Sequence, residues 1–449
     1  MATKQLVILA YPKIDHEKDY VYFWMPFSLL SIAKMLLDEG NTEVLLFDGN
    51  QSDEAEWERF LDRHLDRAIC IGLSVMTGGG QIAHALNMAA IAKSRRSCPP
   101  LVFGGPHVNV LPDQTLAHPL VDFILIGPGQ TSMPAFVAAL QGRRALSNVP
   151  GLKAKTLGGL VVGPENPART RDLGAYPWHL LDVEKYVRDD PVVSPRTLNY
   201  VSSQGCVYKC RFCYELTYKR KYSRIGADVL LSDVTELVEN FGIGGIKFYD
   251  ADWFIDIHRA ATFARGLIDQ RMNIRWAASI NPNDIVKARR LEPELLPLIR
   301  DSGCSRLLMG VESGSDRILA EVVEKEITRD GIIEVAKQIA DHGILGSYTF
   351  IVGFPGESPR EQAETYDLIE RLWKLTPTPE TRVHVFAPYP GTPLFDAAIS
   401  HGFKPPVSFE KWATYDYYDS LTPWTDSTTV RKARAYTRMK LAPVRMETA

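Results

Sequence analysis

The chain has 449 residues, a length that predicts two or three domains with separate hydrophobic cores. Its 51 Lys and Arg against 54 Asp and Glu give a formal net charge of -3, which argues against a general nucleic-acid-binding protein, because such proteins usually carry a large basic excess. Hydrophobic residues make up 45% of the chain, yet no apolar run approaches the roughly 18–20 residues of a membrane span, so we expect a cytoplasmic protein.

The first 145 residues alternate short apolar strands with helical patterns. Strands are expected at residues 6–10, 43–47, 68–74, 101–105 and 123–126, and helices at 26–39, 54–65 and 80–94. This alternation predicts an α/β domain with a parallel sheet and helices on both faces.

Glycine-rich stretches follow three of these strands. They supply the candidate ligand-binding residues Ser74, Thr77, Gly104, Gly105, His107, Gly127, Gly129 and Gln130. Ligands of open parallel sheets bind at the carboxyl ends of the strands, and glycine lets the backbone approach a ligand closely. No G-x-G-x-x-G motif follows the first strand, which argues against a nicotinamide cofactor.

Residues 146–195 are rich in Pro and Gly and are expected to form a linker with a small hairpin at 153–162. The strand and helix alternation then resumes from residue 198. Six strands are expected, at residues 198–202, 245–249, 275–279, 306–310, 347–352 and 382–386. Polar or glycine-rich loops follow each strand, which predicts a partial (βα)6 barrel with its chemistry at the carboxyl-terminal rim.

Three of the six cysteines fall within eight residues, at Cys206, Cys210 and Cys213. The C-x3-C-x2-C spacing suits a 4Fe–4S cluster in which three thiolates leave one iron open, because clusters normally take four cysteine ligands. A zinc knuckle or structural thiol cluster is the alternative. Zinc needs a fourth ligand, however, and no Cys or His follows at zinc-finger spacing.

Residues 196–400 resemble the radical S-adenosylmethionine (SAM) superfamily. The resemblance rests on the cysteine spacing, on Phe212 before the third cysteine, and on the strings MGVESGS, IVGFPGES and PYPGTPL. It implies that Glu312 binds the ribose or amino group of SAM, and that Gly353 and Pro355 shape the adenine pocket.

Further SAM contacts implied by this resemblance are Ser279 and Asn281, at its methionine moiety. The alternatives are that Glu312 is a helix N-terminal acid and that Ser279 and Asn281 only cap a helix. Asp250 and Asp252 are expected to be rim or substrate residues rather than metal ligands, although a two-carboxylate metal site remains an alternative.

The first domain resembles the cobalamin-binding domain of the cobalamin-dependent subclass of this superfamily. The matching pieces are the Gly104-Gly105-Pro106-His107 turn and the Gly127-Pro128-Gly129-Gln130 turn. The resemblance implies a Rossmann-like, doubly wound domain over residues 1–145 that binds cobalamin through the glycine-rich loops. The D-x-H-x-x-G motif that ligates cobalt in cobalamin carriers is lacking. His107 is expected to orient the backbone or contact the tail, with cobalt ligation as the alternative.

The combined resemblance implies an enzyme that cleaves SAM to a 5′-deoxyadenosyl radical and C-methylates an unactivated carbon of a small molecule. Radical-mediated oxidative cyclisation, as in the anaerobic magnesium-protoporphyrin monomethyl ester cyclase, or rearrangement is the alternative reaction, and a non-catalytic cobalamin or iron–sulfur module is the alternative class. A tRNA methylthiotransferase would need a second cysteine triad, and the first domain has only Cys70 and Cys98. The expected partners are a small-molecule substrate and an electron donor such as a flavodoxin or ferredoxin, with no nucleic acid.

Residues 401–449 form an extension dense in aromatic side chains, at Trp412, Tyr415, Tyr417, Tyr418 and Trp424. These side chains would either line an apolar substrate pocket or pack against the barrel, and the sequence leaves both interpretations open.

Overall fold

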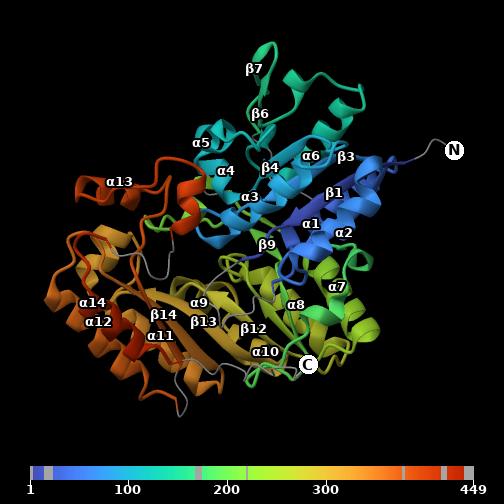
Figure 1. The fold of residues 1–449 in the computed structure, drawn as a ribbon. Helices are drawn as coiled ribbons and strands as arrows, with labels where there is room; N and C mark the ends of the chain where they lie inside the picture. Colours follow the sequence, from blue (N-terminus) through green and yellow to red (C-terminus); the bar gives the residue numbers. More distant parts are fainter. Residues whose placement is uncertain are drawn as a thin grey trace. The chain divides into compact units, whose positions relative to one another are not determined.

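The computed structural model describes residues 4–14, 24–166, 174–218, 221–376, 380–415 and 422–438 (Figure 1). The chain divides into two compact units. The amino-terminal unit holds Met1–Lys185 together with Lys404–Tyr417, and the barrel unit holds Tyr186–Phe403 together with Tyr418–Ala449. The chain therefore returns to its first unit for a short segment near its end.

A mostly parallel sheet lies at the centre of the amino-terminal unit. Its seven strands follow the order β2-β1-β3-β4-β5-β6-β7, and those from β1 to β5 pair in parallel. They are β1 (Gln5–Tyr11), β2 (Thr42–Asp48), β3 (Ala68–Ser74), β4 (Leu101–Gly104), β5 (Phe123–Leu125), β6 (Leu152–Thr156) and β7 (Gly159–Val162). The strand order reverses between β1 and β3, which places a crevice at their carboxyl ends.

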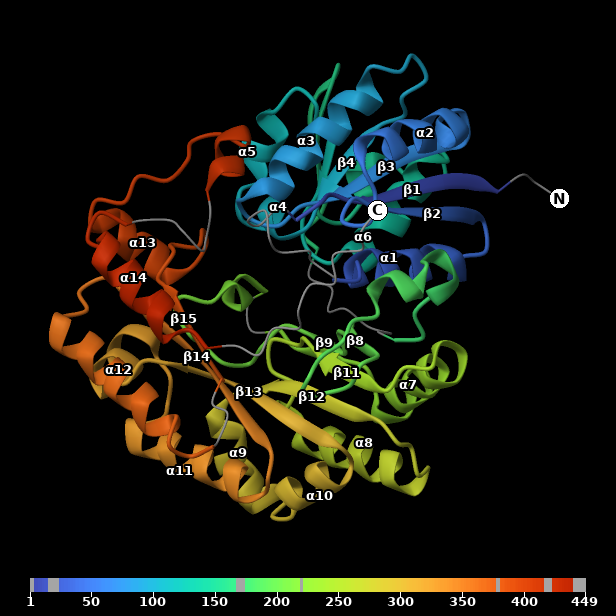
Figure 2. The same ribbon diagram turned by 60° about the horizontal axis from the view of Figure 1, so that its bottom comes forward.

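Helices cover both faces of this sheet, as Figure 2 shows. They are α1 (Phe27–Asp38), α2 (Glu54–His64), α3 (Gly80–Lys93), α4 (Pro106–Val110), α5 (Pro112–Ala117) and α6 (Gly129–Leu140). On one face Val7 and Leu9 of β1 share a core with Phe136 of α6. On the other, the indole nitrogen of Trp57 in α2 donates to the Met88 carbonyl of α3 at 3.1 Å. The predicted doubly wound α/β fold is confirmed.

The hairpin expected in the linker extends the first sheet. Strand β6 pairs antiparallel with β5, and β7 pairs antiparallel with β6. The outer strand exposes Leu160 and Val162, while Leu152 and Ala154 of β6 are fully buried. Residues 146–166 therefore pack within the amino-terminal unit.

The barrel unit is built on six parallel strands in the order β15-β14-β13-β12-β11-β8. They are β8 (Thr197–Tyr200), β11 (Gly245–Phe248), β12 (Arg275–Ile280), β13 (Cys304–Glu312), β14 (Leu345–Val352) and β15 (Glu380–Val385). All pairings between neighbours are parallel, so the six carboxyl ends lie along one edge of the sheet. The predicted partial (βα)6 barrel is confirmed.

The helices that lie along the outer side of the curled sheet (Figure 2) are α7 (Ala227–Phe241), α8 (Ile257–Asp269), α9 (Pro282–Leu291), α10 (Leu295–Asp301), α11 (Arg329–Asp341) and α12 (Pro359–Leu372). The barrel unit also contains the π-helical turn η6 (Ile318–Val323) and the helices α13 (Pro393–Ser400) and α14 (Ser427–Tyr436). Between sheet and helices, the ring of Trp253 lies 5.1 Å from Trp276 and 5.7 Å from Phe263. Burial of such large aromatic side chains supplies much of the packing energy.

The aromatic residues of the carboxyl-terminal extension divide between the two units. Trp412 is buried in the amino-terminal unit, where its indole nitrogen donates to Gln114 at 3.0 Å. Trp424 belongs to the barrel unit and donates to the carbonyl of Gly353 at 2.9 Å. Each indole is therefore held by a hydrogen bond within its own unit. Tyr417 and Tyr418 lie outside the described residues.

Candidate active site

The candidate residues of the barrel unit lie at the carboxyl ends of its parallel strands. The cysteine loop follows β8. Ser279 is the second-to-last residue of β12, and Asn281 directly follows that strand. Glu312 ends β13, and Gly353 and Pro355 follow β14. The fold therefore brings to one edge of the sheet the residues to which the sequence analysis assigned the cluster and SAM.

The base of the cysteine loop is held by a buried carboxylate. Asp250, after β11, accepts hydrogen bonds from the Ser202 backbone at 2.7 Å, the Ser202 hydroxyl at 2.8 Å and the Ser203 hydroxyl at 2.8 Å, and also from the Ser203 backbone. Arg259 donates to the Ser202 carbonyl at 3.2 Å. Since four donors and a nearby cation satisfy this carboxylate, Asp250 is a structural residue that fixes where the loop starts.

A short two-stranded ladder closes the same loop. It pairs β9 (Ser203–Gln204) with β10 (Ser223–Arg224) in antiparallel fashion. Gly205, directly after β9, has φ of +81°, and a Cβ there would lie 1.7 Å from the Lys221 carbonyl oxygen. Only glycine fits at this point, so the Gly205-Cys206 pair in the sequence has a steric cause.

The three thiols share one loop in a poorly solvated environment. Burial raises the pKa of Cys206 to about 12 and raises the pKa values of Cys210 and Cys213 as well, and Cys210 adds to the raised pKa of both Cys206 and Cys213. Within the described residues, no three His, Cys, Asp or Glu side chains are gathered closely enough to hold a metal ion. Three soft thiolate donors on one loop nevertheless fit an iron–sulfur cluster, and its binding would release their protons.

The second half of the cysteine loop is hydrogen-bonded to the π-helical turn η6. The Arg211 backbone donates to the Val323 carbonyl at 3.0 Å, and its guanidinium donates to the Glu321 carbonyl at 3.3 Å. Lys209 lies 3.3 Å from the carboxylate of Glu326, just beyond the turn. π-Helical turns are rare and often occur at functional sites, and here the turn contacts the segment between the second and third cysteines.

Glu312 forms a buried ion pair that the sequence analysis missed. The Lys325 ammonium, 5% exposed, lies 3.0 Å from Glu312 Oε1 and also donates to the carbonyl of Gly310. Burial alone lowers the pKa of Lys325, but Glu312 and the neighbouring Cys210 raise it above its usual value, so Lys325 is charged. Lys325 follows Glu312 by 13 positions, across a π-helical turn that no local sequence pattern predicts.

The backbone at Glu312 is strained. Its φ is +72°, a left-handed conformation that is uncommon for residues other than glycine. A Cβ on Gly310 would lie 2.6 Å from Glu312 Oε1, so the glycine leaves room for this carboxylate. Such strain persists where the surroundings enforce it, and it often marks a functional position.

Glu312→Gln is expected to weaken SAM binding while the cluster is retained. The substitution keeps the shape and removes the charge, and a lost charge-assisted hydrogen bond typically costs about 1.5–3 kcal/mol, or roughly ten- to a hundredfold in affinity. Equilibrium binding of SAM to the iron-loaded protein measures this. The exposed Glu236→Gln on α7 is the matched control. Unchanged SAM affinity in Glu312→Gln would contradict a role of Glu312 in SAM binding and leave it only its ion pair with Lys325.

Ser279 and Asn281 make local contacts in the structure. The Ser279 hydroxyl donates to the Asp250 carbonyl at 2.5 Å. The Asn281 side chain accepts from the Asn283 backbone at 3.0 Å and caps α9. These contacts agree with the capping alternative, and SAM binding by these two residues stays a prediction.

The loop after β14 presents an aromatic surface to the cysteine loop. The ring of Phe354 lies 6.1 Å from Phe212 and 5.4 Å from Phe386. Gly353, with φ of +81°, and the Phe354 backbone both donate to the carboxylate of Glu357, at 2.5 and 3.3 Å. Burial raises the pKa of Glu357 to about 7. An aromatic surface beside Phe212 suits the adenine ring that the sequence analysis places at Gly353 and Pro355.

In the amino-terminal unit, the glycine-rich loops after β3, β4 and β5 differ in the space they leave. A Cβ on Gly105 would lie 2.8 Å from the Val75 carbonyl and 2.9 Å from the Ser74 hydroxyl. On Gly129 it would lie 2.5 Å from Ile32, and on Gly127 it would lie 3.1 Å from Asn166. On Gly104 it would meet nothing closer than 3.8 Å. Gly104 is therefore the glycine of this set that leaves space at the carboxyl edge of the sheet.

Two polar side chains at this edge are buried and find no hydrogen-bond partner among the described residues. Thr77 is 2% exposed and its hydroxyl has no partner in the described part of the chain, and the same holds for both ring nitrogens of the fully buried His107. Buried polar groups are nearly always paired, so these atoms indicate a missing partner. Together with the open space at Gly104, they fit a large polar ligand such as cobalamin. Gln130 is buried in the first turn of α6.

His107 packs against the segment Lys404–Tyr417, which belongs to the amino-terminal unit although it follows most of the barrel unit in the sequence. Its ring is 5.0 Å from Phe409 and 6.0 Å from Trp412, and the Trp412 carbonyl accepts from the Gly79 backbone at 3.0 Å. Burial lowers the pKa of His107 to about 3, so the ring is neutral. The covering aromatics, 302 or more positions away in sequence, explain why the sequence analysis could not place this histidine.

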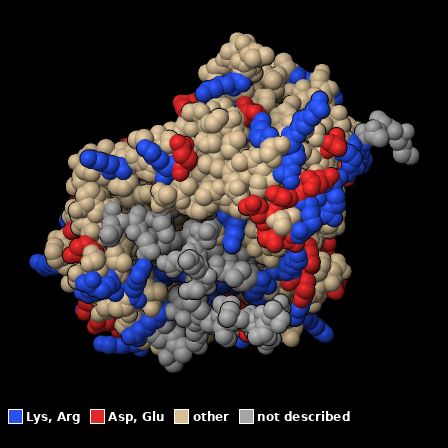
Figure 3. Space-filling model, in the orientation of Figure 1, with Lys and Arg blue, Asp and Glu red and all other residues tan. Residues whose placement is uncertain are grey.

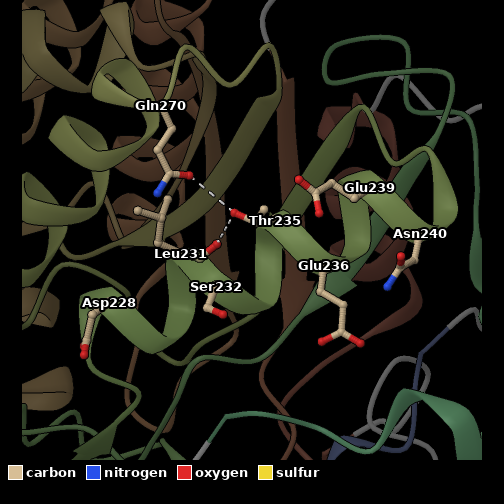
Figure 4. Close-up of a pocket in the computed structure, with 8 residues that line it drawn as sticks. All are labelled: Asp228, Leu231, Ser232, Thr235, Glu236, Glu239, Asn240 and Gln270. Atoms are coloured by element: carbon tan, nitrogen blue, oxygen red, sulfur yellow. Dashed lines mark hydrogen bonds between the residues drawn. The ribbon is translucent and has the colours of Figure 1, made fainter.

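Two surface hollows lie in the barrel unit. One, of about 400 Å³, runs along α7 and is lined mostly by polar side chains, shown in Figure 4. Another, of about 680 Å³, lies between the starts of α11 and α12. On the face drawn in Figure 3, acidic and basic side chains are interspersed. None of the described helices is long and apolar enough to cross a membrane.

Comparison with protein families gives two matches. Residues 200–369 match the radical SAM superfamily, and residues 19–137 match the B12 binding domain. The first range spans β8 to α12 and includes the cysteine loop, Glu312 and the loop after β14. The second spans α1 to α6 and includes the glycine-rich loops.

Curated relatives include two methyltransferases and a cyclase. An uncharacterised methyltransferase of Pyrococcus horikoshii is 26% identical, over 93% of this chain and 88% of its own length. The anaerobic magnesium-protoporphyrin IX monomethyl ester cyclase of Rubrivivax gelatinosus is 25% identical, over 83% and 66%. The cytidylyl-2-hydroxyethylphosphonate methyltransferase of Streptomyces wedmorensis is 24% identical, over 68% and 61%.

Solved structures of similar fold include two that bind cobalamin. The radical SAM methyltransferase TsrM from Kitasatospora setae, with cobalamin and a [4Fe-4S] cluster bound, gives a TM-score of 0.68 at 19% identity, covering 89% of this chain and 75% of TsrM. The cobalamin-dependent radical enzyme OxsB, with aqua-cobalamin and SAM bound, also gives 0.68, at 18% identity, covering 82% and 52%. At these identities the likeness shows a shared fold.

Proposed function

We propose that this chain, which belongs to the cobalamin-dependent enzymes of the radical SAM superfamily, C-methylates an unactivated carbon of a small molecule. Its cofactors are a 4Fe–4S cluster, SAM and cobalamin. When bound, these groups supply the radical chemistry and the methyl group, and the protein's part is to hold them in position.

The proposed roles follow from the contacts at the barrel edge. Cys206, Cys210 and Cys213 would hold the cluster. Glu312, kept in place by Lys325 at 3.0 Å, would accept hydrogen bonds from the hydroxyl or amino groups of SAM. Phe212, with Phe354 at 6.1 Å, would cover the adenine. The observation that carries the proposal is the three-cysteine loop at the same sheet edge as the strained Glu312.

The cobalamin role rests on the amino-terminal unit. We propose that residues 1–145 bind it through the loops after β3, β4 and β5, with Thr77 and His107 as candidate polar contacts. We further propose residues 196–400 as the catalytic domain, 146–195 as the connection and 401–449 as an extension. The segment Lys404–Tyr417 would complete the first domain, because Phe409 and Trp412 pack on His107.

Radical-mediated ring formation is the second candidate function. It is favoured by the similarity to the cyclase of Rubrivivax gelatinosus, which covers 83% of this chain. Both reactions start from the same SAM-binding edge, so the residues of that edge do not discriminate between them. The proposed partners are a small-molecule substrate and a one-electron donor such as a flavodoxin or ferredoxin.

The test uses the full chain reconstituted anaerobically with iron, sulfide and cobalamin, and incubated with small-molecule extracts. SAM labelled with deuterium in its methyl group is added with a reductant. We expect a product that carries the labelled methyl group, detected by mass spectrometry. A product that has lost hydrogen and gained no label would favour ring formation and overturn methyl transfer.

A further inference from the structure

The segment between the first two cysteines is tied to helix α9 by one tyrosine. Tyr208 donates its hydroxyl hydrogen bond to Asp284 Oδ1 in the first turn of α9. The ammonium of Lys287, one turn further along, donates to the Tyr208 oxygen at 2.5 Å and lies 4.4 Å from the centre of its ring. A chain of hydrogen bonds therefore runs from an exposed lysine through the cysteine loop to a buried acid.

Asp284 is the buried end of this chain. Its residue is 0% exposed, and Asp252, which follows β11, is 3% exposed beside it. Oδ2 of each carboxyl has no hydrogen-bond donor among the described residues, while Asp252 Oδ1 accepts from the Phe254 backbone at 3.1 Å. Burial and the neighbouring Asp284 raise the pKa of Asp252 well above its usual value.

Two buried carboxyl groups in contact do not both ionise. The raised pKa of Asp252 favours its protonated form, which can donate a hydrogen bond to Asp284. Asp284 Oδ1 accepts from Tyr208, and the Lys287 ammonium lies 3.4 Å from the same oxygen. One carboxylate thus joins the cysteine loop, the loop after β11 and the start of α9.

This acid does not serve to hold the base of the cysteine loop. Asp250 already does so through four hydrogen bonds from Ser202 and Ser203. Burying a second carboxylate is costly unless it is fully hydrogen-bonded, and here the hydrogen bond from the cysteine loop comes from Tyr208, between Cys206 and Cys210. The contact therefore acts on the middle of the loop.

We propose that Asp284 is a positioning residue that acts through Tyr208 to fix Cys206 and Cys210 relative to the SAM-binding edge. The proposal rests on the proposed function, in which these cysteines hold the cluster. Without the contact, the loop would still supply three thiolates, so the cluster would assemble. Its orientation toward Glu312 would no longer be fixed, so SAM would bind more weakly.

The test compares Tyr208→Phe, Asp284→Asn, Asp284→Leu and the Tyr208→Phe/Asp284→Leu double variant. We expect wild-type iron content in Tyr208→Phe, with the SAM concentration that half-saturates the change in the cluster's EPR signal raised about tenfold, as for a lost hydrogen bond to a charged group. Asp284→Asn keeps the acceptor for Tyr208 and should stay within about twofold of wild type. Asp284→Leu should resemble Tyr208→Phe.

The double variant and a control separate positioning from general stability. The double variant should be no worse than Asp284→Leu alone, because both single changes remove the same contact. Thermal unfolding of the cluster-free proteins should show the same lack of additivity. Tyr436→Phe, which removes a tyrosine–carboxylate hydrogen bond of 2.6 Å to Glu370 on the outer helices, should leave the SAM titration unchanged.

Two outcomes overturn the proposal. One is a Tyr208→Phe protein with wild-type iron content and an unchanged SAM titration. The other is a protein that loses iron in proportion to its loss of thermal stability, with an unchanged SAM titration in the loaded fraction. A wild-type chain that assembles no cluster would instead overturn the proposed function, so the two failures are distinguishable.

Discussion

Cys210→Ala is expected to abolish both the iron–sulfur cluster and all cleavage of SAM, as are Cys206→Ala and Cys213→Ala. The three thiols share one loop. Asp250 accepts hydrogen bonds from the start of this loop, and η6 accepts a hydrogen bond from its second half. The other cysteines of the chain, Cys70, Cys98 and Cys304, lie outside this loop in the sequence, so none is placed on the loop to replace a lost ligand. Iron and sulfide analysis, with chromatographic detection of 5′-deoxyadenosine, measures both effects.

The control for this prediction is Cys304→Ala. Cys304 is buried at the start of β13, at the opposite end of that strand from Glu312, and its thiol makes a 3.8 Å contact to the Arg306 carbonyl. Its loss should leave a small cavity and a modest loss of stability, with cluster and SAM cleavage retained. Full cluster content in Cys210→Ala would refute the assignment of the triad.

Gly104→Val is expected to prevent cobalamin binding while SAM cleavage at the barrel survives. The valine side chain would occupy the space at the carboxyl end of β4, where a Cβ meets no atom closer than 3.8 Å. The protein therefore leaves room for the added Cβ, and thermal unfolding shows whether a lost cofactor reflects the filled space or a disturbed fold. The cobalamin absorbance of the purified protein, per chain, is the measurement.

Gly129→Val is a less specific variant at the same edge. Its Cβ would lie 2.5 Å from Ile32 of α1, so it would disturb the packing of α6 whether or not cobalamin binds. Thermal unfolding distinguishes the two, because Gly104→Val should unfold near the wild-type temperature and Gly129→Val well below it. Wild-type cobalamin content in Gly104→Val would exclude this loop from the binding site.

Much of the fold could be predicted from the sequence because the strands are short apolar runs bounded by turn residues. The expected strand at 68–74 coincides with β3, and the six barrel strands were placed within two residues at every end. β13 differs by two residues at both ends, because Cys304 and Ser305 extend it at its start and Val311 and Glu312 extend it at its end.

The contacts that organise the candidate site could not be predicted in the same way. Lys325 reaches Glu312 only because a π-helical turn intervenes, and Asp284 looks like an ordinary acid in the first turn of a helix until its burial against Asp252 is known. Phe409 and Trp412 cover His107 from the far end of the chain. The spacing of apolar residues along the sequence predicts local secondary structure, whereas these pairings depend on tertiary contacts.

Cofactor content together with the fate of SAM tests the central claim most directly. The wild-type chain, reconstituted anaerobically with iron, sulfide and cobalamin, is analysed for metal and cobalamin, then reduced in the presence of SAM. We predict about four irons and about one cobalamin per chain, and formation of both 5′-deoxyadenosine and S-adenosylhomocysteine once substrate is supplied. A chain that takes up iron and cleaves SAM, yet retains no cobalamin while still modifying its substrate, would contradict cobalamin-dependent methyl transfer.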